Sequence, residues 1–201
     1  MSTEVFNIIR RLGKDNIELQ IATQCAPVIS GLKISNLLIT ALTNETFIIN
    51  LFKNSDIDVL KLASNKDKVF FLVYRKDALK EYLSSNDVNK LLIEYGYESD
   101  ELSYVLHEFS LRYNFCLNNF TPFPHELGLI LGYPVEDVIK FVKYKGKNYL
   151  HVGYWKVYED PKTKLELFEK FDSATEAFSK LVGRGVSINH IVKSYYAHGS
   201  N

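Results

Sequence analysis

The sequence predicts an α+β fold, with a small mixed sheet of about four strands packed with many helices. Apolar runs rich in β-branched or aromatic residues occur at 34–41, 59–63, 69–74 and 149–158, as is typical of strands. A long stretch of helical patterning separates the third run from the fourth. This separation favours α+β over a regular doubly wound sheet, in which strands and helices alternate.

The N-terminal part is expected to hold two helices, at 3–12 and 16–26, with Gly13 between them. Apolar residues recur at helical spacing in the second of them. The run 69–74 is apolar throughout, as in a strand that is covered on both faces. Further helices are expected at 44–53, 76–84, 86–95, 124–132, 134–146, 162–182 and 187–196.

Another helix is expected after Ser99, which has the residue type of an N-cap. Its buried stripe is predicted by apolar residues at intervals of three and four. These residues are Leu102, Val105, Leu106, Phe109, Tyr113 and Cys116.

The composition argues against several classes of protein: nucleic-acid-binding, membrane-spanning and disulfide-rich. Hydrophobic residues make up 46% of the 201 residues and basic and acidic side chains balance at 24 each, so net charge gives no reason to expect a nucleic acid or an anionic membrane. No apolar run approaches the roughly 20 residues of a membrane span. Two cysteines are too few for a disulfide framework. We therefore expect a single domain, 1–201, in the cytoplasm, with no membrane partner.

One catalytic hypothesis places Cys25 as nucleophile, His125 as base and Glu126 or Asn36 as the orienting group, because a thiolate needs a base that is itself held in place. The opposing interpretation is structural, since Cys25 continues an apolar stripe with Ile17 and Ile21 and free cysteines are mostly buried packing residues.

Aromatic and cationic side chains are concentrated between residues 123 and 158. Aromatic faces beside a cation can stack a planar ligand such as a base or a flavin, and an arginine can clamp a carboxylate or phosphate. The alternative is that these rings belong to the core. The candidate ligand- or partner-binding residues are Arg75, Arg112, Tyr133, Tyr154, Trp155 and Lys156.

Two further site classes are disfavoured. The segment 125–145 resembles a helix-turn-helix, but Glu136 and Asp137 would face DNA phosphates at the start of the recognition helix. A metal or haem site built from His125, His151, Cys116 or Glu126 lacks the ligand spacing of a known motif. We predict no metal site and disfavour nucleic acid as a partner.

Three segments carry a family resemblance: Thr23-Gln24-Cys25-Ala26-Pro27, Phe123-Pro124-His125-Glu126-Leu127-Gly128, and Gly153-Tyr154-Trp155-Lys156-Val157-Tyr158. With them the chain resembles an uncharacterised domain-of-unknown-function family of about 200-residue cytoplasmic proteins from Clostridia and related anaerobes. The resemblance implies a bacterial cytoplasmic protein, slightly favours a redox- or iron-related role, and brings no activity or cofactor with it.

The function therefore stays unknown at this point, and three hypotheses remain. The favoured one is a non-catalytic binding or adaptor module with an unknown protein or small-molecule partner. The second is a cysteine-dependent hydrolase or acyl/thiol transferase that uses Cys25 and His125. The third is DNA binding through 125–145.

Overall fold

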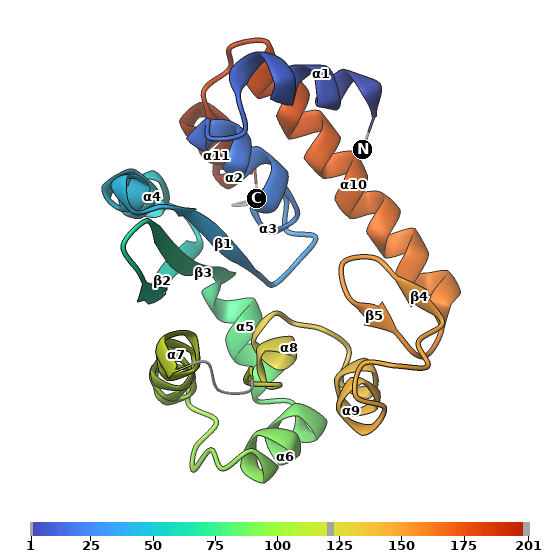
Figure 1. Ribbon diagram of the computed structural model, residues 1–201. Coiled ribbons are helices and arrows are strands. Elements are labelled where there is room, and N and C mark those ends of the chain that lie inside the picture. Colours follow the sequence, from blue (N-terminus) through green and yellow to red (C-terminus); the bar gives the residue numbers. More distant parts are fainter. Residues whose placement is uncertain (1, 120–122, 199–201) are drawn as a thin grey trace. The chain divides into compact units, whose positions relative to one another are not determined.

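The computed structural model describes residues 2–119 and 123–198, and the chain divides into two compact units. Unit 1 comprises Met1–Lys76 and Lys170–Asn201, and unit 2 comprises Asp77–Glu169. The colours of Figure 1 follow this path: the chain leaves unit 1 after its sheet and returns to it within the long helix α10 (Pro161–Gly183). The single domain expected from the sequence stays a prediction.

The sheet of unit 1 has three strands in the order β1-β3-β2, and both neighbouring pairs are antiparallel. The strands are β1 (Ser35–Ala41), β2 (Ile57–Ser64) and β3 (Lys68–Arg75). In the turn between β2 and β3, the Asn65 side-chain oxygen accepts hydrogen bonds from the backbone N–H groups of Asp67 and Lys68. The α+β class is confirmed, but the sheet is antiparallel and not mixed.

The core of unit 1 lies on the side of β3 that carries Val69, Phe71 and Val73, all of which are fully buried. Leu38 of β1 lies opposite Phe71 in the register and is also fully buried. Phe70, Leu72 and Tyr74 of β3 are at most 9% exposed. The prediction that this strand is covered on both faces is therefore confirmed.

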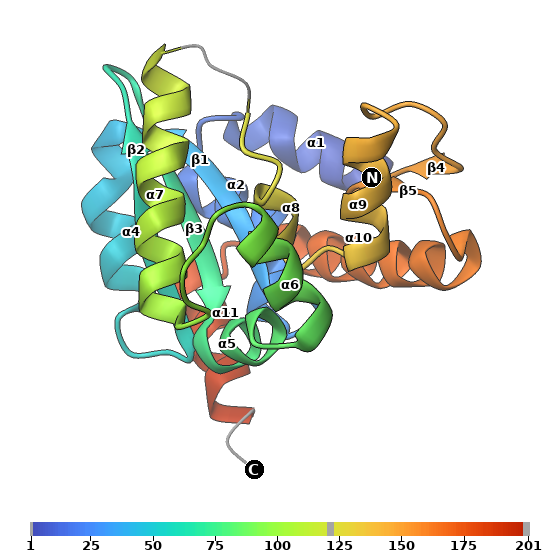
Figure 2. The same cartoon turned by 90° about the horizontal axis from the view of Figure 1, so that it is seen from below.

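In the described part of unit 1, six helical segments accompany α10. Side-chain caps start two of them, because Ser2 accepts a hydrogen bond from the Val5 N–H and Asn16 accepts one from the Leu19 N–H. In both views α4 runs beside β2 (Figures 1 and 2). The segments are α1 (Thr3–Leu12), α2 (Ile17–Gln24), α3 (Ala26–Ile29), the 3₁₀ turn η1 (Leu42–Asn44), α4 (Glu45–Phe52) and α11 (Ile188–His198).

Unit 2 is mostly helical. Its helices before α10 are α5 (Lys76–Leu83), α6 (Asn86–Glu94), α7 (Leu102–Asn119), α8 (Leu127–Ile130) and α9 (Val135–Lys143). All six apolar positions predicted for the buried stripe of α7 are buried. The N-cap prediction for Ser99 is wrong, because α7 begins at Leu102 and the Ser99 hydroxyl instead accepts a hydrogen bond from the Glu101 N–H in the preceding turn.

The predicted fourth strand, 149–158, is also wrong. The segment forms a separate two-stranded hairpin of β4 (His151–Val152) and β5 (Lys156–Val157). The chain reverses at 153–155, so the two alternating faces expected for one continuous strand do not exist. Across the described residues, no helix combines the length and the apolar character that crossing a membrane requires.

The unit 1 core provides a stability prediction. Phe71→Ala should lower the free energy of unfolding by about 3–5 kcal/mol, because it leaves a cavity around a fully buried ring. The matched control Phe47→Ala removes a ring that is 38% exposed and should cost about 1 kcal/mol or less. Chemical denaturation followed by circular dichroism measures both losses, and equal losses would contradict this core assignment.

Candidate functional site

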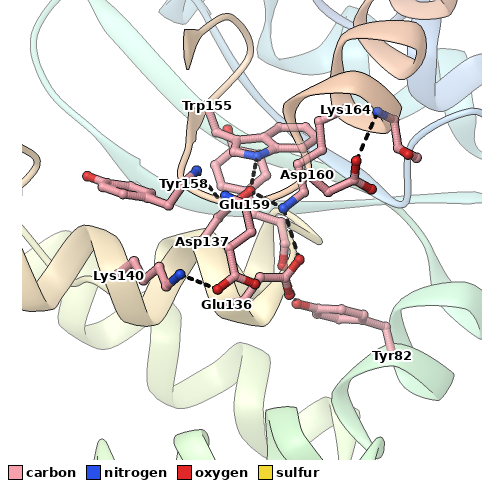
Figure 3. Close-up of polar contacts among 11 residues, drawn as sticks. Tyr82, Glu136, Asp137, Lys140, Trp155, Tyr158, Glu159, Asp160 and Lys164 are labelled. Carbon is pink, nitrogen blue, oxygen red and sulfur yellow. Dashed lines mark hydrogen bonds and ion pairs between the residues drawn. The ribbon is translucent and has the colours of Figure 1, made fainter. Parts of the chain in front are cut away.

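A buried carboxylate, Asp137, organises the part of unit 2 that contains α9 and the hairpin. Asp137 lies in the first turn of α9 and is 2% exposed. One carboxylate oxygen accepts hydrogen bonds from the backbone N–H groups of Tyr158 (2.7 Å) and Glu159 (3.3 Å). The other accepts one from the indole Nε1–H of Trp155 at 2.8 Å. Figure 3 shows the carboxylate among these partners.

Lys164, in the first turns of α10, supplies the charge that balances Asp137. Its Nζ lies 2.9 Å from a carboxylate oxygen of Asp137 and 2.9 Å from one of Glu136. Burial is the largest single effect and opposes the charge on Lys164, but the hydrogen bonds and the charges of Asp137 and Glu136 together outweigh it and raise the lysine pKa. The buried charge on Asp137 is thus paired, as a buried charge must be.

The hairpin lies against α10 through a contact that only a glycine allows. A Cβ atom on Gly153 would lie 2.4 Å from the Phe168 ring, far inside van der Waals distance. The Trp155 ring meets Phe168 edge-on at 4.6 Å, and the Tyr154 ring lies 5.4 Å from it. Gly153 therefore permits the close approach of the hairpin to Phe168.

A cavity of about 310 Å³ opens beside this network. Its walls are mostly aromatic and aliphatic, and they come from the segment before α8, from α8 and α9, and from the hairpin. The lining residues are Phe123, Pro124, His125, Leu127, Gly128, Tyr133, Asp137, Val138, Phe141, Trp155 and Lys156.

The rings around the cavity are held by the chain itself. The Tyr133 ring stacks on Trp155 with centroids 4.9 Å apart, and the Tyr133 hydroxyl donates to the Tyr154 carbonyl at 3.2 Å. Burial raises the pKa of Tyr133 to about 12, so this hydroxyl keeps its proton at neutral pH. His125 meets the Phe141 ring edge-on at 5.9 Å. These contacts leave a preformed apolar space, as small-molecule sites usually are.

Lys156 brings a cation to the cavity. Its Nζ donates to the Gly146 carbonyl at 2.7 Å and lies 5.7 Å from the centroid of Phe141 and 5.0 Å from that of Tyr149. Gly146 has a positive φ of 71°, which favours glycine. The loop between α9 and the hairpin thus holds the lysine side chain over two aromatic rings.

Four of the residues proposed from sequence line this cavity together: His125, Tyr133, Trp155 and Lys156. Tyr154 lies beside them and contacts Phe168. The sequence analysis missed Asp137, Val138 and Phe141 as part of the site. Residues four apart in a helix share a face, so the spacing of Asp137 and Phe141 was the signal that could have identified them.

Glu126 and Arg112 contact each other and the chain around them. The Glu126 carboxylate is buried, lies 3.3 Å from the Arg112 guanidinium and accepts a hydrogen bond from the Tyr97 hydroxyl at 3.4 Å. The guanidinium also donates to the carbonyls of Tyr95 and Gly96 at the end of α6. Both side chains therefore tie α6 to α7 and to the segment before α8.

Arg75 and Cys25 lie in unit 1. The Arg75 guanidinium donates hydrogen bonds to the carbonyls of Val28 and Ile29 at 2.8 Å each, and so caps the C-terminal end of α3. It also forms an ion pair with Asp56. Cys25, between α2 and α3, is fully buried. Burial raises the pKa of its thiol to about 12, against a smaller opposing effect of Lys33.

The residues considered as metal ligands are not brought together. Within 2–119 and 123–198, no three His, Cys, Asp or Glu side chains are grouped as a metal site requires. His151, for example, lies in the hairpin next to Phe168, with the two ring centroids 6.4 Å apart.

Residues 21–192 match the model of a family described as protein of unknown function (DUF3793). The chain belongs to this family. The match confirms the resemblance to an uncharacterised family, and it spans the cavity, the hairpin and the sheet of unit 1. Comparison of the chain with curated proteins and with solved structures gives no match. The family description assigns no activity.

The thiol of Cys25 provides a chemical prediction. Its raised pKa keeps it protonated between pH 7 and 9, where an ordinary thiol ionises, and its burial keeps reagents away. Iodoacetamide labelling, followed by mass spectrometry of the Cys25 peptide, should therefore be no faster than unfolding across this range. Denatured protein is the control and should label quickly. Fast native labelling that slows in His125→Ala would instead support the cysteine-enzyme hypothesis.

The Asp137 network provides a stability prediction. Asp137→Asn should lower the free energy of unfolding by about 3–5 kcal/mol, because it leaves buried Lys164 without its buried counter-charge and sets an amide N–H₂ among donors. Glu136→Gln is the matched control, since it removes the half-exposed partner of the same lysine and should cost about 1 kcal/mol or less. Denaturation followed by Trp155 fluorescence measures both, and equal small losses would contradict the central role of Asp137.

Proposed function

We propose that this DUF3793 protein is a non-catalytic binding module whose ligand occupies the 310 Å³ cavity of unit 2. The observation that carries the proposal is the cavity itself, with four aromatic walls (Phe123, Tyr133, Phe141 and Trp155) and a few polar groups. Its volume lies at the lower end of the range for small-molecule sites. A small organic molecule is therefore the proposed ligand.

Support also comes from how the walls are fixed. Trp155 is held by the hydrogen bond to Asp137 and by the Tyr133 ring. A site whose side chains are already ordered loses less conformational entropy when a ligand binds. The paired charge of Asp137 thus helps to order the cavity wall before a ligand binds.

The two other hypotheses have weaker support. A nucleophilic Cys25 needs a thiolate, and its burial and raised pKa oppose one. A helix-turn-helix needs two helices of some length, whereas α8 is a single turn of four residues. On α9, Lys140 pairs with Glu159, which weakens the basic character of that helix.

We place the module in a reducing bacterial cytoplasm, in a redox- or iron-related setting. Cys25 and Cys116 are both buried and neither is in a disulfide among the described residues, which agrees with a compartment that keeps thiols reduced. The family resemblance described above supports the bacterial origin and the redox- or iron-related setting.

The test is a fragment screen read from the indole N–H signal of Trp155, the only tryptophan of the chain, in ¹H–¹⁵N NMR spectra. Fragments that bind should shift this signal, and Phe141→Ala should weaken them roughly tenfold because it removes a wall of the cavity.

Phe115→Ala is the matched control, since Phe115 is a 59% exposed ring of the same unit that does not line the cavity. It should leave the affinities unchanged. A screen without binders, or equal losses in the two variants, would reject the cavity as the binding site.

A further inference from the structure

The ammonium of Lys156 is the cation at the cavity wall. Lys156 is half-buried, and its ammonium donates to one carbonyl, that of Gly146, and faces two rings. In the part of the chain that the structure describes, no carboxylate pairs with it. An ammonium group has three N–H donors, so two remain for a ligand. A charge in an apolar setting is costly unless it is paired, and a bound anion would supply the pair.

Among the described residues that line the cavity, one has a carboxylate, and this carboxylate is closed to a ligand. Asp137 is 2% exposed, and its two oxygens are taken by two backbone N–H groups, the Trp155 indole and Lys164. Its charge is balanced by Lys164 at 2.9 Å. The basic groups of the described wall are then His125 and Lys156, and of these two residue types lysine is the one that carries a full charge at neutral pH.

The aromatic part of the cavity wall determines which ligand shapes fit. Phe141 and Trp155 lie on the cavity together with Phe123 and Tyr133. Aromatic rings prefer offset or edge-on contact with other rings, and such pairs are worth more than the area they bury. The volume of about 310 Å³ limits the ligand to a small one. Flat rings on several sides favour a planar aromatic body over a bulky aliphatic one.

We infer that the ligand class of this cavity is a small planar aromatic carboxylate, with its ring system against Phe141 and Trp155 and its carboxylate on the ammonium of Lys156. This inference rests on the proposed function and names its ligand class. The carboxylate would accept the two N–H donors of Lys156 that the chain leaves unused, and such charge-assisted hydrogen bonds are the strong ones.

The experiment compares three probes of nearly equal size: 2-naphthoate, its neutral isostere 2-naphthamide, and the non-planar decalin-2-carboxylate. Each is titrated into the full chain at pH 7.5, with affinity taken from the Trp155 indole N–H shift and from calorimetry. We expect 2-naphthoate to bind roughly tenfold more tightly than either of the others. This comparison needs only the wild-type protein.

The variant Lys156→Met keeps the length of the side chain and removes its charge. It should lower the affinity for 2-naphthoate to that for 2-naphthamide and leave the amide unaffected. Lys147→Met is the matched control, because Lys147 is an exposed lysine of the loop between α9 and the hairpin and does not line the cavity. Lys156→Arg should keep the preference for the carboxylate. The spectrum of Trp155 shows whether each variant is folded.

Each outcome decides the inference. A preference for 2-naphthoate that Lys156→Met abolishes and Lys147→Met preserves supports it. Equal binding of the acid and the amide overturns the role of the anion, while still showing that the cavity binds aromatic molecules. Equal binding of decalin-2-carboxylate overturns the planar ring. No binding of any probe overturns the whole inference, and the fragment screen described above then decides separately whether the cavity binds anything else.

Discussion

The buried charge of Asp137 is the interaction on which the site in unit 2 depends. A carboxylate removed from water is stable only when its charge is balanced and its oxygens accept hydrogen bonds. Here a lysine from α10, an indole and two backbone N–H groups from the hairpin meet both needs. One side chain thus joins three consecutive segments: α9, the hairpin with the residues after it, and the start of α10.

Two different lysines balance the buried carboxylate and offer a cation to a ligand. Lys164 balances the acid and Lys156 stays available at the cavity. Both are lysines, but their surroundings differ: Lys164 contacts two carboxylates, whereas Lys156 contacts a carbonyl and the faces of two rings. Position in the fold, and not residue type, decides which lysine is structural and which is free to bind.

The features predicted correctly from the sequence are those that depend on the local pattern of apolar residues. The buried stripe of α7 and the doubly covered strand β3 follow from spacing within a few turns or residues, and the residues His125, Tyr133, Trp155 and Lys156 were recognisable as a concentration of rings and cations. The hairpin was missed because residues 149–158 have strand propensity throughout. The contacts that hold the reversed segment, such as that of Gly153 with Phe168 and that of Trp155 with Asp137, are tertiary. The burial of Asp137 was missed for the same reason, because its counter-ion lies 27 residues further along the chain.

The path of the chain has a consequence for how the protein is made. The core of unit 1 is built from residues as early as Ile8 and as late as Val192, and the DUF3793 match ends at that same Val192. Unit 2, in contrast, is one continuous segment. On a ribosome, the continuous unit can complete its contacts while the sheet of the other still lacks α11. Ile188, Ile191 and Val192 of α11 therefore join this core last, and until then the surfaces of α2 and α4 on which α11 packs lack their apolar cover, which favours aggregation of the nascent chain.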